Sequence, residues 1–250
     1  MIELNITLGL LIFILSVFQS IFGIGLLALG TPLLLIGGFS FIQALFILLP
    51  CSITVSLLTF FLINRKYKKN LNKEIIKKFI FYSLPGIIMG LIIIFFYELN
   101  LNFKILIGSL IIISILLKRF IAKKLIHKVV MKKTINFVIG LIHGISNMGG
   151  SFLSIYLLVL YKDKMKIRYH LTFAYIFFSI TQLIFLHLTF NEINNTYNIE
   201  FLFIFSILGA LIGNILEKFF NKEFFFKVLN TSILVTGCIL IFKSIAEIIY

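Results

Sequence analysis

The longest uncharged stretch of the chain decides its class, because no Asp, Glu, Lys or Arg occurs between Glu3 and Arg65. Similar apolar runs recur towards the C-terminus, and 60% of all residues are hydrophobic while only 13% are charged. A soluble domain carries about a quarter charged residues, whereas a membrane-spanning helix needs about 20 consecutive apolar ones. The sequence therefore predicts an all-α integral membrane protein.

The basic residues are interpreted as topology signals. A formal net charge of +14 would indicate nucleic-acid binding in a soluble protein, but here the Lys and Arg residues lie in short loops between apolar runs. Such loops face the cytoplasm and contact anionic lipid headgroups. We therefore expect a multi-pass protein of the cell membrane, with the lipid bilayer as a partner, no nucleic acid, and cytoplasmic loops at 65–78 and 118–133.

The breaks between apolar runs define eight predicted segments. They are Ile6–Leu35, Phe39–Ile63, Ile75–Tyr97, Leu101–Leu117, Thr134–Leu160, Tyr169–Phe190, Phe201–Phe219 and Phe224–Ile249. The second half repeats the first, since a Ser followed by a Gly-x-x-x-Gly pair, typical of close helix packing, occurs at both 83–90 and 206–213. We expect a first membrane repeat at 1–120, a basic connecting loop at 118–133 and a second membrane repeat at 134–250.

The distribution of charge favours one arrangement of these segments. If all eight cross fully, most basic residues of the second repeat fall on the side opposite to those of the first. If segments 6–35 and 134–160 instead enter and return, all 23 basic residues except Lys104 and Lys243 share one side, as the positive-inside rule favours. The two repeats are then inverted, which is typical of transporters. Tilted or kinked full spans are the alternative.

Two stretches rich in helix breakers lie inside segments 6–35 and 134–160. They read Gly23-Ile-Gly25-Leu-Leu-Ala-Leu-Gly30-Thr31-Pro32 and Asn147-Met-Gly149-Gly150-Ser151-Phe-Leu-Ser154. A backbone broken at membrane depth must face protein or water, because lipid satisfies none of its polar groups. The helix N-termini at such a break attract anions. We expect a broken or re-entrant first segment in each repeat, with a small anion bound at the breaks; glycines that only allow close packing are the alternative.

These motifs resemble the TauE/SafE family of sulfite-exporter-like membrane permeases, whose two related halves each open with a motif similar to Gly-x-Gly-Gly-Gly-x-x-x-x-Pro. Positions matching the two copies are Gly23, Gly25, Pro32, Gly149 and Gly150, and departures occur at Leu26, Leu27, Asn147 and Tyr156. The resemblance covers essentially the whole chain. It implies a transporter that exports small anions such as sulfite, organosulfonates or related organic acids.

Polar residues at membrane depth are costly and are therefore candidates for function. The candidates for substrate binding are Gly23, Gly25, Thr31, Pro32, His143, Ser146, Asn147, Gly149, Gly150 and Ser151. Further polar residues within the segments are Gln19, Ser20, Gln43, Ser52, Thr54, Thr172, Ser179, Thr181, Gln182 and His187.

His143 is the candidate for proton coupling, because imidazole titrates near neutral pH; a neutral buried His bonded to a carbonyl is the alternative. All nine acidic residues lie at termini, in loops or at segment edges, and no Lys or Arg lies deep in a predicted segment. Export coupled to a proton and facilitated export driven by the membrane potential are both compatible with this pattern.

No catalytic residue, metal ion or cofactor is expected. An intramembrane enzyme needs a nucleophile with a base, paired carboxylates or a metal cluster at membrane depth, and the predicted segments carry none of these. A channel-like pore or an accessory membrane subunit is the nearer alternative to a transporter. Cys51 and Cys238 are expected to be free thiols, because no CxxC spacing surrounds them.

Overall fold

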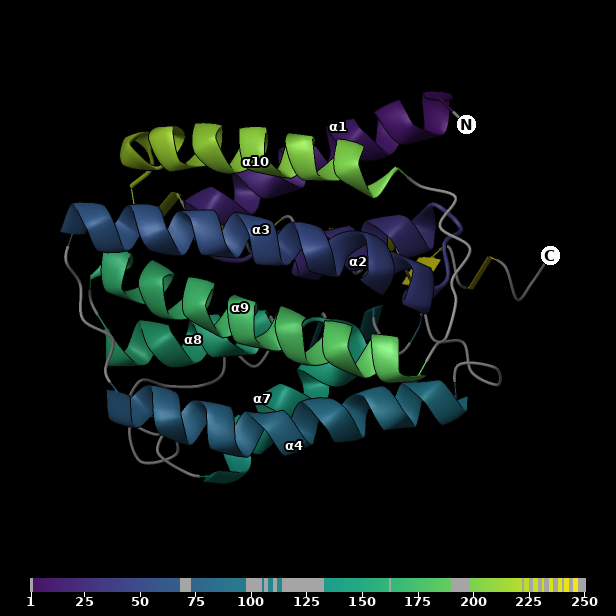
Figure 1. Ribbon diagram of the computed structural model, residues 1–250. Helices are drawn as coiled ribbons and strands as arrows, with labels where there is room; N and C mark the ends of the chain where they lie inside the picture. Colours follow the sequence, from purple (N-terminus) through teal and green to yellow (C-terminus); the bar gives the residue numbers. More distant parts are fainter. Residues whose placement is uncertain are drawn as a thin grey trace.

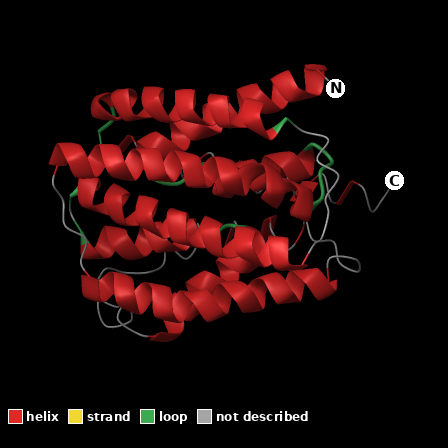
Figure 2. Ribbon diagram, in the orientation of Figure 1, coloured by secondary structure: helices red, strands yellow, loops and turns green. Residues whose placement is uncertain are grey.

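The computed structural model describes residues 2–67, 73–97, 133–161, 163–189 and 198–221, together with isolated positions between 105 and 113 and between 223 and 246. All regular structure in this part of the chain is helical, as the sequence predicts, and Figure 2 shows one bundle of roughly aligned helices. The predicted segments 101–117 and 224–249 and the connecting loop 118–133 lie largely outside the described residues.

The helices follow the predicted apolar runs closely (Figure 1). They are α1 (Ile2–Phe22), α2 (Leu26–Ile36), α3 (Phe41–Tyr67), α4 (Lys73–Tyr97), α7 (Lys133–Ser146), α8 (Gly149–Leu160), α9 (Lys164–Thr189) and α10 (Ile199–Leu216), the last followed by a 3-10 turn at Glu217–Phe219. Five of the helices described here, α1, α3, α4, α9 and α10, are long and apolar enough to cross a membrane.

The first and fifth predicted segments are each divided into two helices. The second helix of each pair is short: α2 has 11 residues and α8 has 12. At a rise of about 1.5 Å per residue, each is about half as long as the roughly 30 Å thickness of the hydrocarbon core. The first break is narrower than the motif predicts, because Pro32 lies inside α2 and not at its end. Within segment 6–35 the chain leaves the helical conformation only in the turn from Gly23 to Gly25.

The two short helices point towards opposite ends of the bundle. In Figure 1 the connection from α2 to α3 lies at the same end as the N-terminus, whereas the connection from α8 to α9 lies at the other end. At this second end α3 and α10 also finish and α4 begins. We call it the basic end, because Arg65, Lys77, Lys164 and Lys218 lie in the helix turns that reach it.

Helices from the first half of the chain pack against helices from the second half. The most extensive contacts join α4 with α7, α1 with α10 and α3 with α9. Glycines allow the first two pairs to approach closely, since a side chain at Gly86 or Gly140 would strike the backbone of the facing helix, and one at Gly213 would strike α1. The Gly-x-x-x-Gly pairs thus pack helices, as expected.

One boundary was predicted wrongly. The sequence places Arg168 in a basic loop before Tyr169, but α9 begins at Lys164 and carries Arg168 inside the helix, with only 2% of its surface exposed. Arg168 is buried near the start of α9, at the basic end and not deep in the segment, so only the predicted boundary of the segment changes. The helix can start early because partners from α1 and α10 satisfy the guanidinium, and the sequence around Arg168 does not reveal them.

We predict that Gly140→Ala destabilises the protein. Alanine favours a helix over glycine by about 1 kcal/mol, but a Cβ at position 140 would lie 2.9 Å from the Ser83 Cα, and overpacking of this kind costs about 1–3 kcal/mol. Thermal unfolding in detergent, followed by reaction of the buried Cys51 thiol with a fluorescent dye, should show a lower melting temperature.

The matched control is Gly9→Ala, whose Cβ would have the rings of Phe201 and Phe205 as its nearest neighbours, at 3.0–3.1 Å. Its melting temperature should remain close to that of the unmodified chain, because side-chain rings can shift more easily than backbone. A melting temperature raised by Gly140→Ala would show that α4 and α7 are not in backbone contact.

Candidate functional site

The two helix breaks share one local geometry. Gly23 has φ +76° and donates its N–H to the Gln19 carbonyl oxygen at 2.7 Å, while Asn147 has φ +61° and donates to the His143 carbonyl oxygen at 2.9 Å. A left-handed residue that bonds back in this way ends a helix. Glycine adopts this conformation freely and Asn is among the few other residues that tolerate it, so Asn147 can end α7 as Gly23 ends α1.

Hydrogen bonds join the two helix breaks. The Asn147 side chain donates its Nδ2 to the Thr31 hydroxyl of α2 at 2.8 Å, and its Oδ1 accepts from Gln182 Nε2 of α9 at 2.9 Å. All three side chains are buried completely. The second motif therefore contacts the first through residues more than a hundred positions apart in the sequence.

Gln19 supports the first break from inside the bundle. Its Oε1 accepts from the Leu26 N–H at 3.0 Å and so caps the N-terminus of α2, while its Nε2 donates to the hydroxyls of Ser52 and Ser56 on α3. Ser179 of α9 extends this chain by donating to Ser52 at 3.1 Å. Polar residues of α1, α3 and α9 thus satisfy groups that lipid could not.

A group of buried polar atoms beside α8 is left without hydrogen bonds. Neither ring nitrogen of His143 has a partner among the described residues, and the same is true of the Tyr175 hydroxyl, the Ser151 hydroxyl and Gln182 Oε1. His143 is fully buried, stacks on Phe178 with ring centroids 4.0 Å apart and meets the Tyr175 ring edge-on at 6.0 Å. Unsatisfied buried polar groups are rare and need an explanation such as a ligand.

Glycine at position 150 brings the Tyr175 hydroxyl to the first turn of α8. A side chain there would occupy the place of that hydroxyl, and one at Gly149 would strike His143 Cβ. The first N–H groups of a helix have no partner within it, and the positive end of the helix dipole favours an anion there. We call His143, Gly149, Gly150, Ser151, Tyr175 and Gln182 the α8 cluster.

The predicted site residues divide into two groups. The structure brings together Thr31, His143, Asn147, Gly149, Gly150 and Ser151 around the contact between the two repeats. Gly23 instead packs near Leu171, Pro32 continues α2, and Gly25 precedes the first turn of α2. The Ser146 hydroxyl donates back to the Ile142 carbonyl oxygen at 2.7 Å, a common use of serine in a helix.

Two residues of this region were not among the predicted site residues. In the sequence Tyr175 looks like an ordinary core aromatic within an apolar run. Its contact with Gly150 is the feature that marks it as part of the site, and this contact is visible only in the structure. Gln182 was recognised as polar at membrane depth, but its position beside Asn147 depends on how α9 packs. A Gly-Gly pair facing a buried tyrosine cannot be recognised from spacing, because the two lie on different helices.

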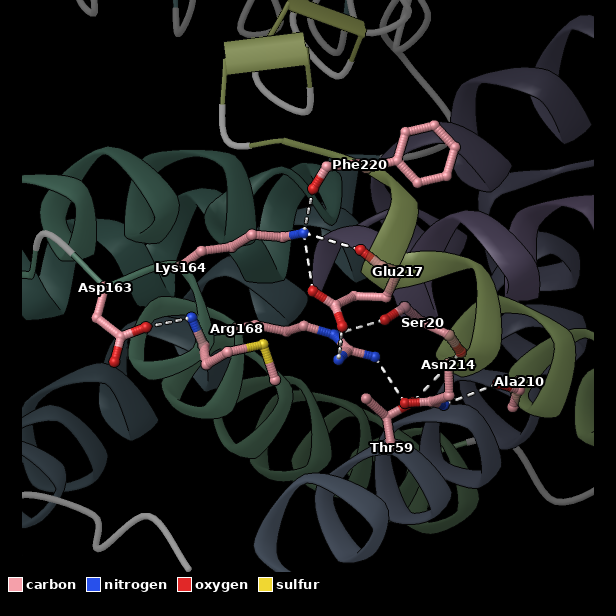
Figure 3. Close-up of polar contacts among 10 residues, drawn as sticks. Ser20, Thr59, Asp163, Lys164, Arg168, Ala210, Asn214, Glu217 and Phe220 are labelled. Atoms are coloured by element: carbon pink, nitrogen blue, oxygen red, sulfur yellow. Dashed lines mark hydrogen bonds and ion pairs between the residues drawn. The ribbon is translucent and has the colours of Figure 1, made fainter. Parts of the chain in front are cut away.

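A second polar cluster lies at the basic end and holds the buried Arg168 (Figure 3). Its Nε donates to the Ser20 carbonyl oxygen near the end of α1 at 2.6 Å, and its Nη2 donates to Asn214 Oδ1 at 2.6 Å. Lys164 contacts the Glu217 carboxylate at 2.8 Å, and Arg168 Nη1 lies 3.7 Å from the other oxygen. This arrangement satisfies a free carbonyl of α1 and ties α1, α9 and α10 together.

Comparison with known proteins gives one result. The sequence model of the family described as Sulfite exporter TauE/SafE matches residues 8–240, nearly the whole chain. No curated protein and no solved structure matches the chain.

We predict that position 147 distinguishes backbone strain from lost hydrogen bonds. Asn147→Leu should destabilise the protein more than Asn147→Gly. A left-handed φ costs an ordinary residue about 1–2 kcal/mol, whereas glycine adopts this conformation without a comparable cost. Both variants lose the bonds to Thr31 and Gln182. Chemical or thermal unfolding in detergent measures the difference; equal stability of the two variants would mean that the α7–α8 turn is not left-handed.

Proposed function

Because the chain belongs to the TauE/SafE family of sulfite exporters and is therefore a multi-pass membrane transport protein, we propose that it exports a small anion, either sulfite, an organosulfonate or a related organic acid. The observation that carries the proposal is the α8 cluster, in which several buried polar groups at a helix N-terminus have no partner among the described residues. These groups are of the kind that an oxyanion would satisfy.

In this proposal the anion lies at the first turn of α8. Its oxygens accept from the hydroxyls of Tyr175 and Ser151 and from an N–H of His143, while the backbone N–H groups of Gly149 and Gly150 face it. Hydrogen bonds to a charged acceptor are stronger than neutral ones. Uncharged donors bind an anion without a permanent countercharge, which suits a carrier that must release it again.

Asn147 and Thr31 are proposed to couple the anion to the first repeat. Asn147 lies between His143 and Gly149 in sequence and bonds to Thr31 on α2, so a shift of α8 on binding would reach α2 directly. Four other candidate residues shape the turns and do not bind the anion; they are Gly23, Gly25, Pro32 and Ser146.

We further propose that the two repeats are inverted in the membrane. Support comes from the opposite directions of α2 and α8 (Figure 1) and from the reciprocal pairing of α1 with α10 and α7 with α4. Inverted repeats with discontinuous helices allow a site to open first to one side and then to the other. The positive-inside rule then assigns the basic end to the cytoplasm, and we propose that the protein lies in the cell membrane.

Transport by the Tyr175→Phe variant tests the proposed site. The substitution removes one hydroxyl that has no partner in the described structure, so folding should be unaffected, whereas a lost hydrogen bond to an anion costs about 1.5–3 kcal/mol. Efflux of labelled sulfite from proteoliposomes at subsaturating concentration should fall about tenfold or more.

The matched control is Tyr82→Phe on α4, which removes the same atom outside the α8 cluster and should leave the efflux rate unchanged. Repeating the assay with and without a pH gradient separates proton coupling from export driven by the membrane potential alone. Normal efflux by the Tyr175→Phe variant would contradict the proposed site. An efflux rate that does not saturate with sulfite concentration in the unmodified chain would favour a pore.

Cysteine labelling tests the proposed orientation. In a chain with Cys51 and Cys238 replaced by serine, Ser40→Cys lies in the exposed α2–α3 connection and Lys166→Cys lies exposed at the basic end. A membrane-impermeant maleimide should label position 40 in intact cells and position 166 only after permeabilisation. Labelling of position 166 in intact cells would contradict the inverted arrangement.

A further inference from the structure

A cavity of about 580 Å³ opens between α3 and α10 at the basic end, apart from the α8 cluster. Its cationic lining comes from three side chains, Arg65 at the end of α3, Lys218 after α10 and the buried Arg168 of α9. Its apolar lining includes Leu62, Leu211 and Ile215, which are 38%, 43% and 60% exposed on the outside of the bundle.

The charge of this cavity favours an anion. Glu217, the one acidic residue among the described residues of its lining, contacts Lys164 at 2.8 Å. Arg65 and Lys218 are exposed, while Arg168 is held in place by Ser20 and Asn214. With three cationic side chains and one carboxylate among the described lining residues, the cavity has a net positive charge.

The polar and apolar parts of the lining are separated along the helix axes. From α10 into the 3-10 turn after it the sequence runs from Leu211 through Ile215 to Lys218, and on α3 from Leu62 to Arg65. Both segments therefore change from apolar to cationic as they reach the basic end. The candidate membrane spans finish at Arg65 and Phe219. The cationic rim therefore lies at the level of the phospholipid headgroups, and the apolar wall lies at the level of the acyl chains.

We propose that this cavity is a binding site for one anionic phospholipid, with the phosphate between Arg65 and Lys218 and an acyl chain along Leu211 and Ile215. Complementary charge favours an anionic headgroup over a zwitterionic one. The exposed apolar wall favours a lipid over a free anion, because a soluble anion would gain nothing from it. The bound lipid joins the ends of α3 and α10 on the outside of the bundle, next to the Arg168 cluster.

Native mass spectrometry of the purified full chain tests the site with phosphatidylglycerol and phosphatidylcholine of identical acyl chains. Phosphatidylglycerol should bind more tightly than phosphatidylcholine. The double variant Arg65→Gln/Lys218→Gln should bind it roughly 30-fold more weakly, since each basic residue near the membrane surface contributes about a fivefold change.

The matched control is Lys77→Gln/Lys166→Gln, which removes two exposed charges at the basic end outside the cavity and should leave phosphatidylglycerol binding nearly unchanged. A second variant, Ile215→Asn, keeps both cations and should also weaken phosphatidylglycerol binding, because it disrupts the apolar wall.

Three results would overturn the proposal. They are equal binding of the two lipids, equal losses in the cavity variant and its control, and displacement of phosphatidylglycerol by glycerol 3-phosphate at comparable concentration. The last result, together with normal binding by Ile215→Asn, would assign the cavity to a soluble anion instead.

Discussion

The hydrogen bond between Asn147 and Thr31 is the interaction on which the central arrangement depends. Two helices that end within the bundle leave free N–H and C=O groups, and lipid cannot satisfy them. Each break must therefore be covered by other parts of the protein. Asn147 achieves this by ending α7 in a left-handed turn while its side chain reaches both α2 and α9.

The two breaks are satisfied in different ways. At the first, Gln19 caps α2 and Arg168 bonds to the Ser20 carbonyl oxygen, so the polar groups around it are largely paired. At the second, His143, Ser151 and Tyr175 keep polar atoms without hydrogen bonds to the described residues. The polar groups of the first break are thus largely paired, whereas those of the second are not, and this difference is the reason why the proposed anion site lies at the second break.

Local features of the sequence are enough to predict the helices and the breaks, because apolar run length and helix-breaking residues act within a few positions. Gly23 and the motif at Asn147 were recognised in this way. Arg168 and Tyr175 were not, since their roles arise from contacts with Ser20 and Gly150 on other helices. Among neighbouring lysines Arg168 looks like a loop residue, and a tyrosine in an apolar run looks like part of the core.

Equilibrium binding of labelled sulfite to the purified protein tests most directly whether the α8 cluster forms one anion site that is coupled to α2 through Asn147 and Thr31. Thr31→Val alters the first repeat and Ser151→Ala alters the second, and each removes a single hydroxyl. The account predicts one saturable site per chain whose affinity falls in both variants. Two independent sites per chain, or unchanged affinity when Ser151 is replaced, would contradict it.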